Sequence, residues 1–501
     1  MELKKAILTG ISLLFLPTGA HTQMLSIHTG GTKVPPYHFE ASARQHSMLS
    51  EAIRGSLLYR GEGFNLEPGH LSHFEYSFKD DSYILRLRDN LRFHNGRNVT
   101  IVDLEFAITR GFFSNKPNFF SARFGEIKGV GKIKPGTKFT SGKIEGITIL
   151  DENTLKIKLN APNPSFLHNL TSPYYSLIPI ESLKEDYLSW KTKPIGAGKY
   201  AVESIDTKEQ HMTLKRDDTI SEKPTRILVS WNGSISKATF DISFEHLDGY
   251  QEYVSQLPVM VKIIEFSNVN TLGSNPSFKK LTSEIIKQSP FIASELGIKP
   301  ADQVLPSHFW GRATTITKST TQAVKSLAKP FENKTVKAAL FSGKPISKKN
   351  HYYVRELISR FKEFGINLII ETTENKFFDK HLCEKYSFFI SGKVVDYTDP
   401  IVMFGAYRTG GHDPFLAPTE PQRKRFDILY RQCATSNKSP QQRANCVKEL
   451  SQFTYDNNIV LALSEEPSLT YYNKKTIKTL GKQTQPLTLR LDNILTTGIQ
   501  K

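Results

Sequence analysis

The chain has 501 residues, of which 38% are hydrophobic and 23% are charged, the balance of a soluble globular protein. Its formal net charge is +17, but lysines and arginines are spread along the chain, and no nucleic-acid-binding motif accompanies them. The composition therefore argues against a nucleic-acid partner and leaves room for two or three domain-sized units.

The N-terminus has the pattern of an export signal. Lys4 and Lys5 precede an apolar run over 6–16, which is too short to cross a bilayer. Small residues follow, so we expect cleavage within 20–23. No cysteine lies near that point, so lipid attachment is not expected. The sequence predicts a soluble, periplasmic protein that is exported through a cleavable signal and is not a lipoprotein.

The first half of the chain shows mostly strand patterns. Apolar and polar residues alternate over 83–88, which predicts a half-buried strand. The pair Asn95-Gly96 then predicts a turn. Thr100 and Asp103 have the spacing of a capping box, which predicts that a helix starts there. Two more hairpins are predicted at 147–159 and 200–214.

The second half shows helices alternating with strands. An apolar face over 352–364 predicts a helix, Gly365 is expected to end it, and 367–371 is the strand that follows. Two further helices are predicted at 425–431 and 443–455. Helix followed by strand is typical of an α/β lobe.

Three cysteines occur, and two of them bracket the polar loop between the last predicted helices. Cys433 and Cys446 could form one disulfide in an oxidising compartment, or could be two buried thiols, and the sequence leaves both open. No C-x-x-C spacing is present, so a structural zinc site is not expected.

The common catalytic motifs are missing from the sequence. It contains no P-loop, no G-x-S-x-G, no H-E-x-x-H and no G-x-G-x-x-G. The 14 histidines are scattered without ligand spacing. His94 and Arg97 flank the predicted turn and are interpreted as turn and surface residues. We therefore expect no enzyme activity, no cofactor and no bound metal.

Five motifs nevertheless occur in an order that is similar to one known family. The stretch "YILRLRDNLRFHNGRNVTIVDLEFAITR" (83–110) resembles the extracellular solute-binding proteins of family 5, the oligopeptide- and dipeptide-binding proteins of ABC importers. Four later stretches resemble the same family: "LDENTLKIKLNAPNPSFL" (150–167), "PIGAGKY" (194–200), "LGSNPSF" (272–278) and "DYTDP" (396–400). Together they extend over nearly the whole chain after the signal.

Several positions depart from the family pattern. Arg54 stands where the family has an acidic residue before Gly-Leu, and Lys393 stands where a Trp is frequent. Ala197 and Lys199 replace the usual Thr and Pro of the third motif. These departures leave the expected fold unchanged and concern the preference for cargo.

The resemblance implies an α/β fold with two lobes, a type II periplasmic binding protein of the cluster C kind, with an extra subdomain inserted in the first lobe. The expected division of the chain is: 1–23 signal peptide, 24–45 first segment of lobe 1, 46–164 inserted subdomain, 165–265 second segment of lobe 1, 266–471 lobe 2, and 472–501 return to lobe 1.

The resemblance also implies a function. A monomer would capture a peptide in the cleft between the lobes and deliver it to ABC permease subunits in the inner membrane. The same fold with nickel, haem or cell-wall peptides as cargo is one alternative. A secreted hydrolase or a surface interaction protein is the alternative from another class.

One acidic residue is the main candidate for ligand binding. In the resembling family the first Asp of the D-Y-x-D-P motif receives the α-amino group of the peptide, which corresponds to Asp396 here. The alternative is that Asp396 only caps a turn before Pro400. The other expected ligand-binding residues lie beside this motif or on a facing segment of the first lobe: Tyr397, Gly392, Val394, Glu40, Ala41 and Ser42.

Overall fold

The computed structural model describes residues 24–31, 35–39, 44–61, 65–77, 80, 82–114, 127–160, 166–218, 220, 222–233, 240–288, 297–341, 352–373, 380–395, 400–409, 415–434, 440–484 and 488–497. The predicted signal segment, 1–23, lies outside these residues. Within the described ranges, no helix is both long enough and apolar enough to cross a membrane.

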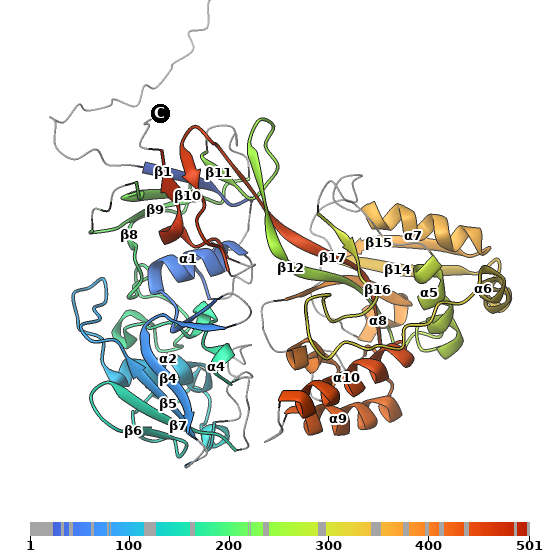
Figure 1. The fold of residues 1–501 in the computed structure, drawn as a ribbon, viewed down its shortest axis with the longest axis horizontal. Helices are drawn as coiled ribbons and strands as arrows, with labels where there is room; N and C mark the ends of the chain where they lie inside the picture. Colours follow the sequence, from blue (N-terminus) through green and yellow to red (C-terminus); the bar gives the residue numbers. More distant parts are fainter. Residues whose placement is uncertain are drawn as a thin grey trace, which may run out of the picture.

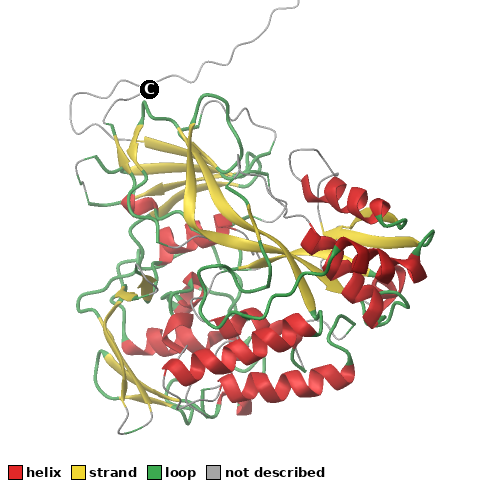
Figure 2. Cartoon of the chain, turned by 45° about the vertical axis from the view of Figure 1, so that its right-hand side comes forward, coloured by secondary structure: helices red, strands yellow, loops and turns green. Residues whose placement is uncertain are grey.

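The chain forms two lobes that lie side by side (Figure 1). Two long strands, β12 (Gln251–Phe266) and β17 (Val460–Tyr472), run diagonally from the first lobe into the second. They pair antiparallel from Gln251 opposite Tyr472 to Glu265 opposite Val460. Figure 2 shows the same pair from another side, as the two strands that link the sheets of the lobes.

One sheet extends through both lobes. Among the described residues its order is β15-β14-β16-β12-β17-β11-β1-β10-β9-β8, and β13 pairs with β17. The other strands of this sheet are β1 (Met24–His28), β8 (Ala201–Asp206), β9 (His211–Lys215), β10 (Arg226–Ser230), β11 (Ile242–Ser243), β13 (Lys299–Pro300), β14 (Thr335–Phe341), β15 (Asn367–Thr373) and β16 (Phe388–Val394). β8 with β9 confirms the hairpin predicted at 200–214.

A second sheet with the helix beside it forms the small-sheet subdomain of the first lobe. Its strands are β4 (Leu71–Ser77), β5 (Ser82–Leu87), β6 (Ile147–Ile149) and β7 (Thr154–Lys158), in the order β4-β5-β7-β6, with α2 (Ile101–Phe113) packed against them. Two short ladders complete the first lobe: β2 (Leu58–Arg60) with β3 (Leu66–Pro68), and β18 (Ile477–Thr479) with β19 (Leu495–Thr496).

The remaining helices belong mostly to the second lobe, as the colours of Figure 1 show. They are α5 (Pro276–Gln288), α6 (Thr321–Ala328), α7 (Tyr352–Glu363), α8 (Lys380–Lys385), α9 (Glu420–Ala434) and α10 (Pro440–Asp456) in the second lobe, and α1 (Arg44–Arg54) and α4 (Phe166–Asn169) in the first. The predicted helix–strand unit is confirmed as α7 and β15. The two late helices are confirmed too, and both are longer than predicted.

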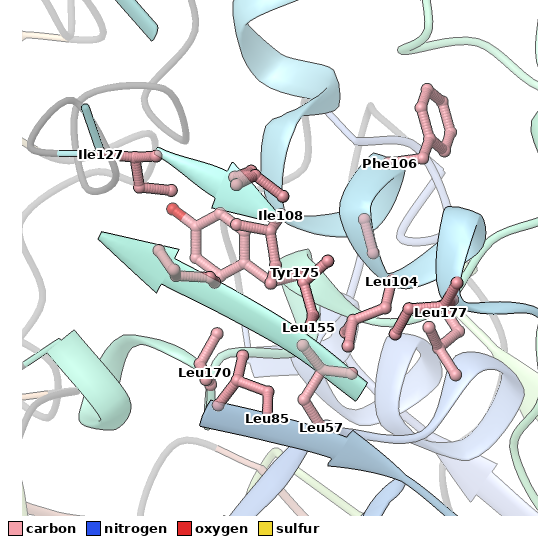
Figure 3. Close-up of a cluster of buried hydrophobic side chains, with 14 of the residues drawn as sticks. Leu57, Leu85, Leu104, Phe106, Ile108, Ile127, Leu155, Leu170, Tyr175 and Leu177 are labelled. Atoms are coloured by element: carbon pink, nitrogen blue, oxygen red, sulfur yellow. The ribbon is translucent and has the colours of Figure 1, made fainter. Parts of the chain in front are cut away.

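The small-sheet subdomain has its own core. Leu85 and Leu155 of the sheet, Leu104 and Ile108 of α2, and Leu57 near the end of α1 lie in one cluster of buried side chains (Figure 3). The apolar face predicted for the helix thus packs onto the strand predicted before it. The hairpin of β6 and β7 completes this sheet, as the sequence indicated.

The start of α2 confirms the predicted capping box. Asp103 accepts hydrogen bonds from the backbone N–H and the hydroxyl of Thr100, at 2.8 and 2.9 Å. The guanidinium of Arg97 also donates to both oxygens of Asp103, at 2.7 and 2.9 Å. Arg97 therefore fixes the turn to the helix that follows it.

His94 differs from the prediction, because it does not lie freely on the surface. It is half-buried, and its Nε2 donates to the carbonyl of Gly198 at 3.0 Å. Gly198 in turn lies directly on the end of α1, where a Cβ would come within 2.3 Å of the carbonyl oxygen of Ala52. His94 therefore joins the turn of the small-sheet subdomain to the loop 194–200.

The question of the cysteines has a structural answer. Cys433 of α9 and Cys446 of α10 form a disulfide, with their Cα atoms 5.5 Å apart. Both are buried in the second lobe beside Leu450 and Phe426. The bond holds the two last helices together across their loop. Cys383 is buried elsewhere in the same lobe and takes no part in this bond.

Candidate functional site

The expected ligand-binding strand is β16, and its two edges differ. One edge pairs with β12 along the whole strand, from Phe388 opposite Phe266 to Val394 opposite Met260. The other edge pairs with β14 only as far as Ile390. From Ser391 to Val394 the second edge has no strand partner among the described residues, so its backbone groups could accept an added strand.

The two predicted residues of β16 lie on its exposed face. Gly392 is exposed, and a Cβ there would come within 2.3 Å of the sulfur of Met260. Val394 is 41% exposed, although Val395 directly after it is buried and donates to the carbonyl of Val259 at 2.8 Å. The strand therefore presents a small residue and an apolar one to solvent while its end is fixed to β12.

The opposite face of β16 carries a polar group. Ser391 donates to the carboxylate of Glu265 at 2.7 Å, and the hydroxyl of Tyr407 reaches the same carboxylate at 3.4 Å. The ammonium of Lys393, at the position where the family often has Trp, lies 4.5 Å from the centre of the Tyr407 ring. This cation–π contact holds the side chain of Lys393 against Tyr407.

The remaining predicted ligand-binding residues lie outside the described part of the chain. Asp396 and Tyr397 fall in 396–399, between Val395 and the 3-10 turn that begins at Pro400. Glu40, Ala41 and Ser42 fall in 40–43, between Phe39 and α1. Their roles stay predictions.

Arg54, which replaces the acidic residue of the family, lies in a buried basic cluster at the end of α1. Arg54 and Arg110 are each 2% exposed, and their guanidinium carbons lie 4.8 and 4.3 Å from the centre of the Phe39 ring. Arg110 donates to the carbonyls of Tyr174 and Tyr187. Burial lowers the pKa of Arg54 to about 9 and that of Arg110 to about 10.

His46 lies in the same cluster. Its Nδ1 is 2.8 Å from the carbonyl of Pro36, and its Nε2 is 3.1 Å from the hydroxyl of Ser50. The ring stacks on Tyr174 at 4.9 Å. The pair of contacts suits a neutral imidazole that donates from Nδ1 and accepts at Nε2. Burial, and next the positive charge of Arg54, lower the pKa of His46 to about 3.

Basic side chains of the two lobes lie near enough to act on the pKa values of one another. Arg60 ends β2 and His168 lies in α4, both in the first lobe. His308 precedes Phe309 in the second lobe, and Arg443 lies in α10. Arg60 and Arg443 are 7% and 5% exposed, and the two histidines are half-buried. We call these four residues the interlobe basic group.

The pKa of each histidine is influenced by a basic residue of the opposite lobe. Burial lowers the pKa of His168 to about 4, with further lowering by Arg60 and by Arg443 of the opposite lobe. Burial also lowers the pKa of His308 to about 4, with further lowering by Arg312 and by Arg60 of the opposite lobe. Among the described residues no carboxylate contributes to either shift. The basic side chains of each lobe therefore disfavour protonation of the histidine in the other lobe.

The interlobe basic group was missed in the sequence. Its members stand at 60, 168, 308 and 443, so no spacing relates them, and each one alone is an ordinary basic residue. These residues come near one another only in the folded protein, where the two lobes lie side by side.

The second lobe contains a cavity of about 410 Å³. All its lining residues fall within 283–465, so it belongs to this lobe alone. Its charged residues are paired inside the lobe. Glu465 accepts from the hydroxyl of Ser307 at 2.7 Å, and Lys287 pairs with Glu284 at 2.9 Å. Within the described residues, no three His, Cys, Asp or Glu side chains come together as a metal site.

The sequence matches a known family and curated relatives. Residues 65–226 match the family described as bacterial extracellular solute-binding proteins, family 5, middle part. The dipeptide-binding protein DppE of Bacillus subtilis is 23% identical over 447 residues, which cover 79% of this chain and 78% of DppE. The oligopeptide-binding protein OppA of the same organism is 30% identical over 129 residues, which cover 25% of this chain and 23% of OppA.

Solved structures share the fold over nearly the whole chain. The ABC transporter substrate-binding protein CtaP of Listeria monocytogenes has a TM-score of 0.75 at 16% identity, covering 95% of this chain and 99% of CtaP. The periplasmic binding protein DppA of Helicobacter pylori, in complex with the peptide STSA, has 0.69 at 15%, covering 94% and 98%. NikA of Brucella suis, in complex with Fe(III)-EDTA, has 0.75 at 12%, covering 95% and 100%. The two-lobed α/β fold predicted from the sequence is confirmed.

Proposed function

Residues 65–226 match family 5 of the bacterial extracellular solute-binding proteins, and on that premise we propose that the chain belongs to this family and captures peptides for an ABC importer. It would act by binding and release, without catalysis, and would deliver its cargo to permease subunits in the inner membrane. A cleavable N-terminal signal would place it in the periplasm as a monomer.

The observation that carries this proposal is the edge of β16 that has no strand partner among the described residues. From Ser391 to Val394 the strand offers main-chain donors and acceptors next to the strands that join the lobes. Every peptide brings a matching main chain, so an added strand can be held whatever its side chains are. Gly392 and the exposed Val394 give this edge a low, partly apolar face on which different side chains can lie.

The two ends of the peptide would meet opposite charges. We assign the α-amino group to Asp396, with Tyr397 beside it and with Glu40, Ala41 and Ser42 on the facing segment. We assign the carboxylate, or an acidic side chain, to the interlobe basic group. Charge-assisted hydrogen bonds to both ends would fix the direction of the peptide in the cleft.

The proposal is tested by the cargo itself. The protein would be purified from its periplasm, mildly denatured, and its released ligands identified by mass spectrometry, where we expect peptides. Adding one such peptide to the emptied protein should raise its melting temperature and make it more compact in small-angle scattering. A chelated metal, haem or turnover of an added substrate would contradict the proposal.

Replacing Arg60 by Gln is expected to weaken the binding of a peptide with a free C-terminus by about 1.5 kcal/mol, since one charge-assisted hydrogen bond is lost. The same peptide with a C-terminal amide should bind wild type more weakly and should lose little more in the variant. Titration calorimetry measures both affinities.

Arg86→Gln is the matched control, because Arg86 is exposed on β5 in the small-sheet subdomain. It removes the same charge away from the lobe junction and should leave both affinities unchanged. If Arg60→Gln weakens acid and amide equally, the interlobe basic group does not receive the carboxylate.

A further inference from the structure

The small-sheet subdomain has a cavity of about 780 Å³, and all its lining residues fall within 113–147. None of them belongs to the interlobe basic group or to β16. Four of the lining residues are lysines, all of them exposed: Lys132, Lys134, Lys138 and Lys143. We call this feature the lysine cavity.

The lysine cavity is an exception to the even spread of charge along the sequence. Within 128–145 there are five lysines and one acidic residue, Glu145. Glu145 pairs with Lys128 at 2.6 Å and with Lys132 at 3.1 Å, so two lysines share one carboxylate. These two hydrogen bonds lower the pKa of Glu145. Lys134, Lys138 and Lys143 form no ion pair with a carboxylate of the described residues.

A buried carboxylate holds one side of the lysine-bearing loop. Glu105 of α2 is 0% exposed and accepts hydrogen bonds from the hydroxyl of Ser141 and from the backbone N–H of Gly142, the latter at 3.1 Å. A buried charge of this kind is costly unless its partners are in place. Ser141 and Gly142, directly before Lys143, are therefore fixed to the helix.

Aromatic packing holds the middle of the loop. Phe139 is 7% exposed, and its ring meets the rings of Phe106 and Phe113 edge-on at 5.1 and 5.3 Å. Its backbone N–H donates to the hydroxyl of Tyr187 at 2.9 Å, and Gly136 donates to the carbonyl of Phe113 at 2.8 Å. The loop is anchored from the inside, so the lysines are presented outward on a fixed backbone.

Such an arrangement costs free energy in the empty protein, because like charges line one cavity on an ordered loop. A bound anion would relieve that repulsion. The entropy cost of ordering the loop on binding would be small, because the loop is already ordered. Lysine ammonium groups are compact point charges that suit phosphate oxygens. Part of the cavity lining is apolar, which suits a phosphate attached to a carbon chain or ring. The apolar lining residues are Phe113, Ile133, Ile144 and Ile147.

We propose that the lysine cavity is a phosphate-binding site, separate from the cargo cleft and independent of the proposed function. The chemistry shared by the possible ligands is a negatively charged phosphate group. It can come from a soluble phosphorylated molecule or from the headgroup of an anionic phospholipid, where it would bring the exported protein to the membrane surface.

The test compares two variants with equal loss of charge. The site variant is Lys134→Gln, Lys138→Gln and Lys143→Gln, and the control variant is Lys208→Gln, Lys424→Gln and Lys448→Gln, three lysines exposed elsewhere on the described chain. The probes are inorganic tripolyphosphate, followed by calorimetry, and phosphatidylcholine vesicles with or without phosphatidylglycerol, followed by flotation.

We expect wild type to bind at least one probe, with an affinity that falls as salt is added. The site variant should lose roughly tenfold or more, because three charge-assisted contacts are gone, and the control variant should lose little. Tripolyphosphate binding identifies a soluble ligand, and binding to the phosphatidylglycerol vesicles alone identifies a headgroup.

Equal losses in the two variants would overturn the proposal, because the net charge alone would then explain the binding. Failure of wild type to bind either probe would overturn it as well. Peptide binding, measured in parallel, should be the same in all three proteins. This site and the peptide function can therefore fail separately.

Discussion

Asp396→Asn is expected to weaken the binding of a peptide with a free N-terminus by about 2–5 kcal/mol if the ion pair is buried in the closed cleft. The substitution keeps the shape of the side chain and removes its charge, so the α-amino group loses its counter-ion. Titration calorimetry on the wild type and the variant, with one peptide identified as cargo, measures the loss.

An N-acetylated form of the same peptide separates this role from a structural one. It should bind wild type weakly and lose little more in the variant, because the amine is already absent. If the free and the acetylated peptide bind wild type equally well, Asp396 is not the amine receptor. The interpretation of Asp396 as a turn cap would then be preferred, and the melting temperature of the variant should be lowered.

Lowering the pH from 7 to 4 is expected to destabilise the fold, with His46 alone accounting for roughly 3 kcal/mol of the free energy of unfolding. Burial holds the pKa of His46 at about 3 in the folded protein, against 6.5 ordinarily. Between these values the unfolded chain binds a proton that the folded chain does not. The stabilisation is therefore complete above pH 6.5 and is lost as the pH falls toward 3.

Urea unfolding at several pH values measures this effect. His46→Gln should be less stable at pH 7, because two hydrogen bonds and a ring contact change, but its stability should fall less steeply toward pH 4. His73→Gln is the control, since the His73 side chain is 55% exposed. An equally steep pH dependence in His46→Gln and wild type would show that His46 is not the group responsible.

The parts of the fold that were predicted correctly are those with local signals. The capping box at Thr100 and the helix that Gly365 ends each depend on residues within one or two turns. The two-lobed arrangement came from the order of five motifs, not from local pattern. The sequence left the pairing of Cys433 and Cys446 open because chain spacing does not show which thiols meet.

The candidate site was harder to predict, because its residues come from distant segments. Arg60 and His308 act on each other only because β12 and β17 bring the two lobes together. Glu105 could not be distinguished from a surface residue of α2 in the sequence, since its partners belong to a loop more than thirty residues later. The lysines of that loop were counted with the general basic excess, and their grouping in one cavity was missed.

The continuity of the large sheet has a consequence for how the protein melts. β12 and β17 pair with each other, and the end of β17 at Tyr472 also pairs with β11 of the first lobe. Toward the second lobe, β12 pairs with β16 and β17 pairs with β13. Neither lobe therefore has a complete sheet when the other is unfolded. Loss of one lobe would leave long unpaired edges on the other, which are prone to aggregation. The two lobes should thus unfold in a single cooperative step, and neither should be obtainable as a stable fragment.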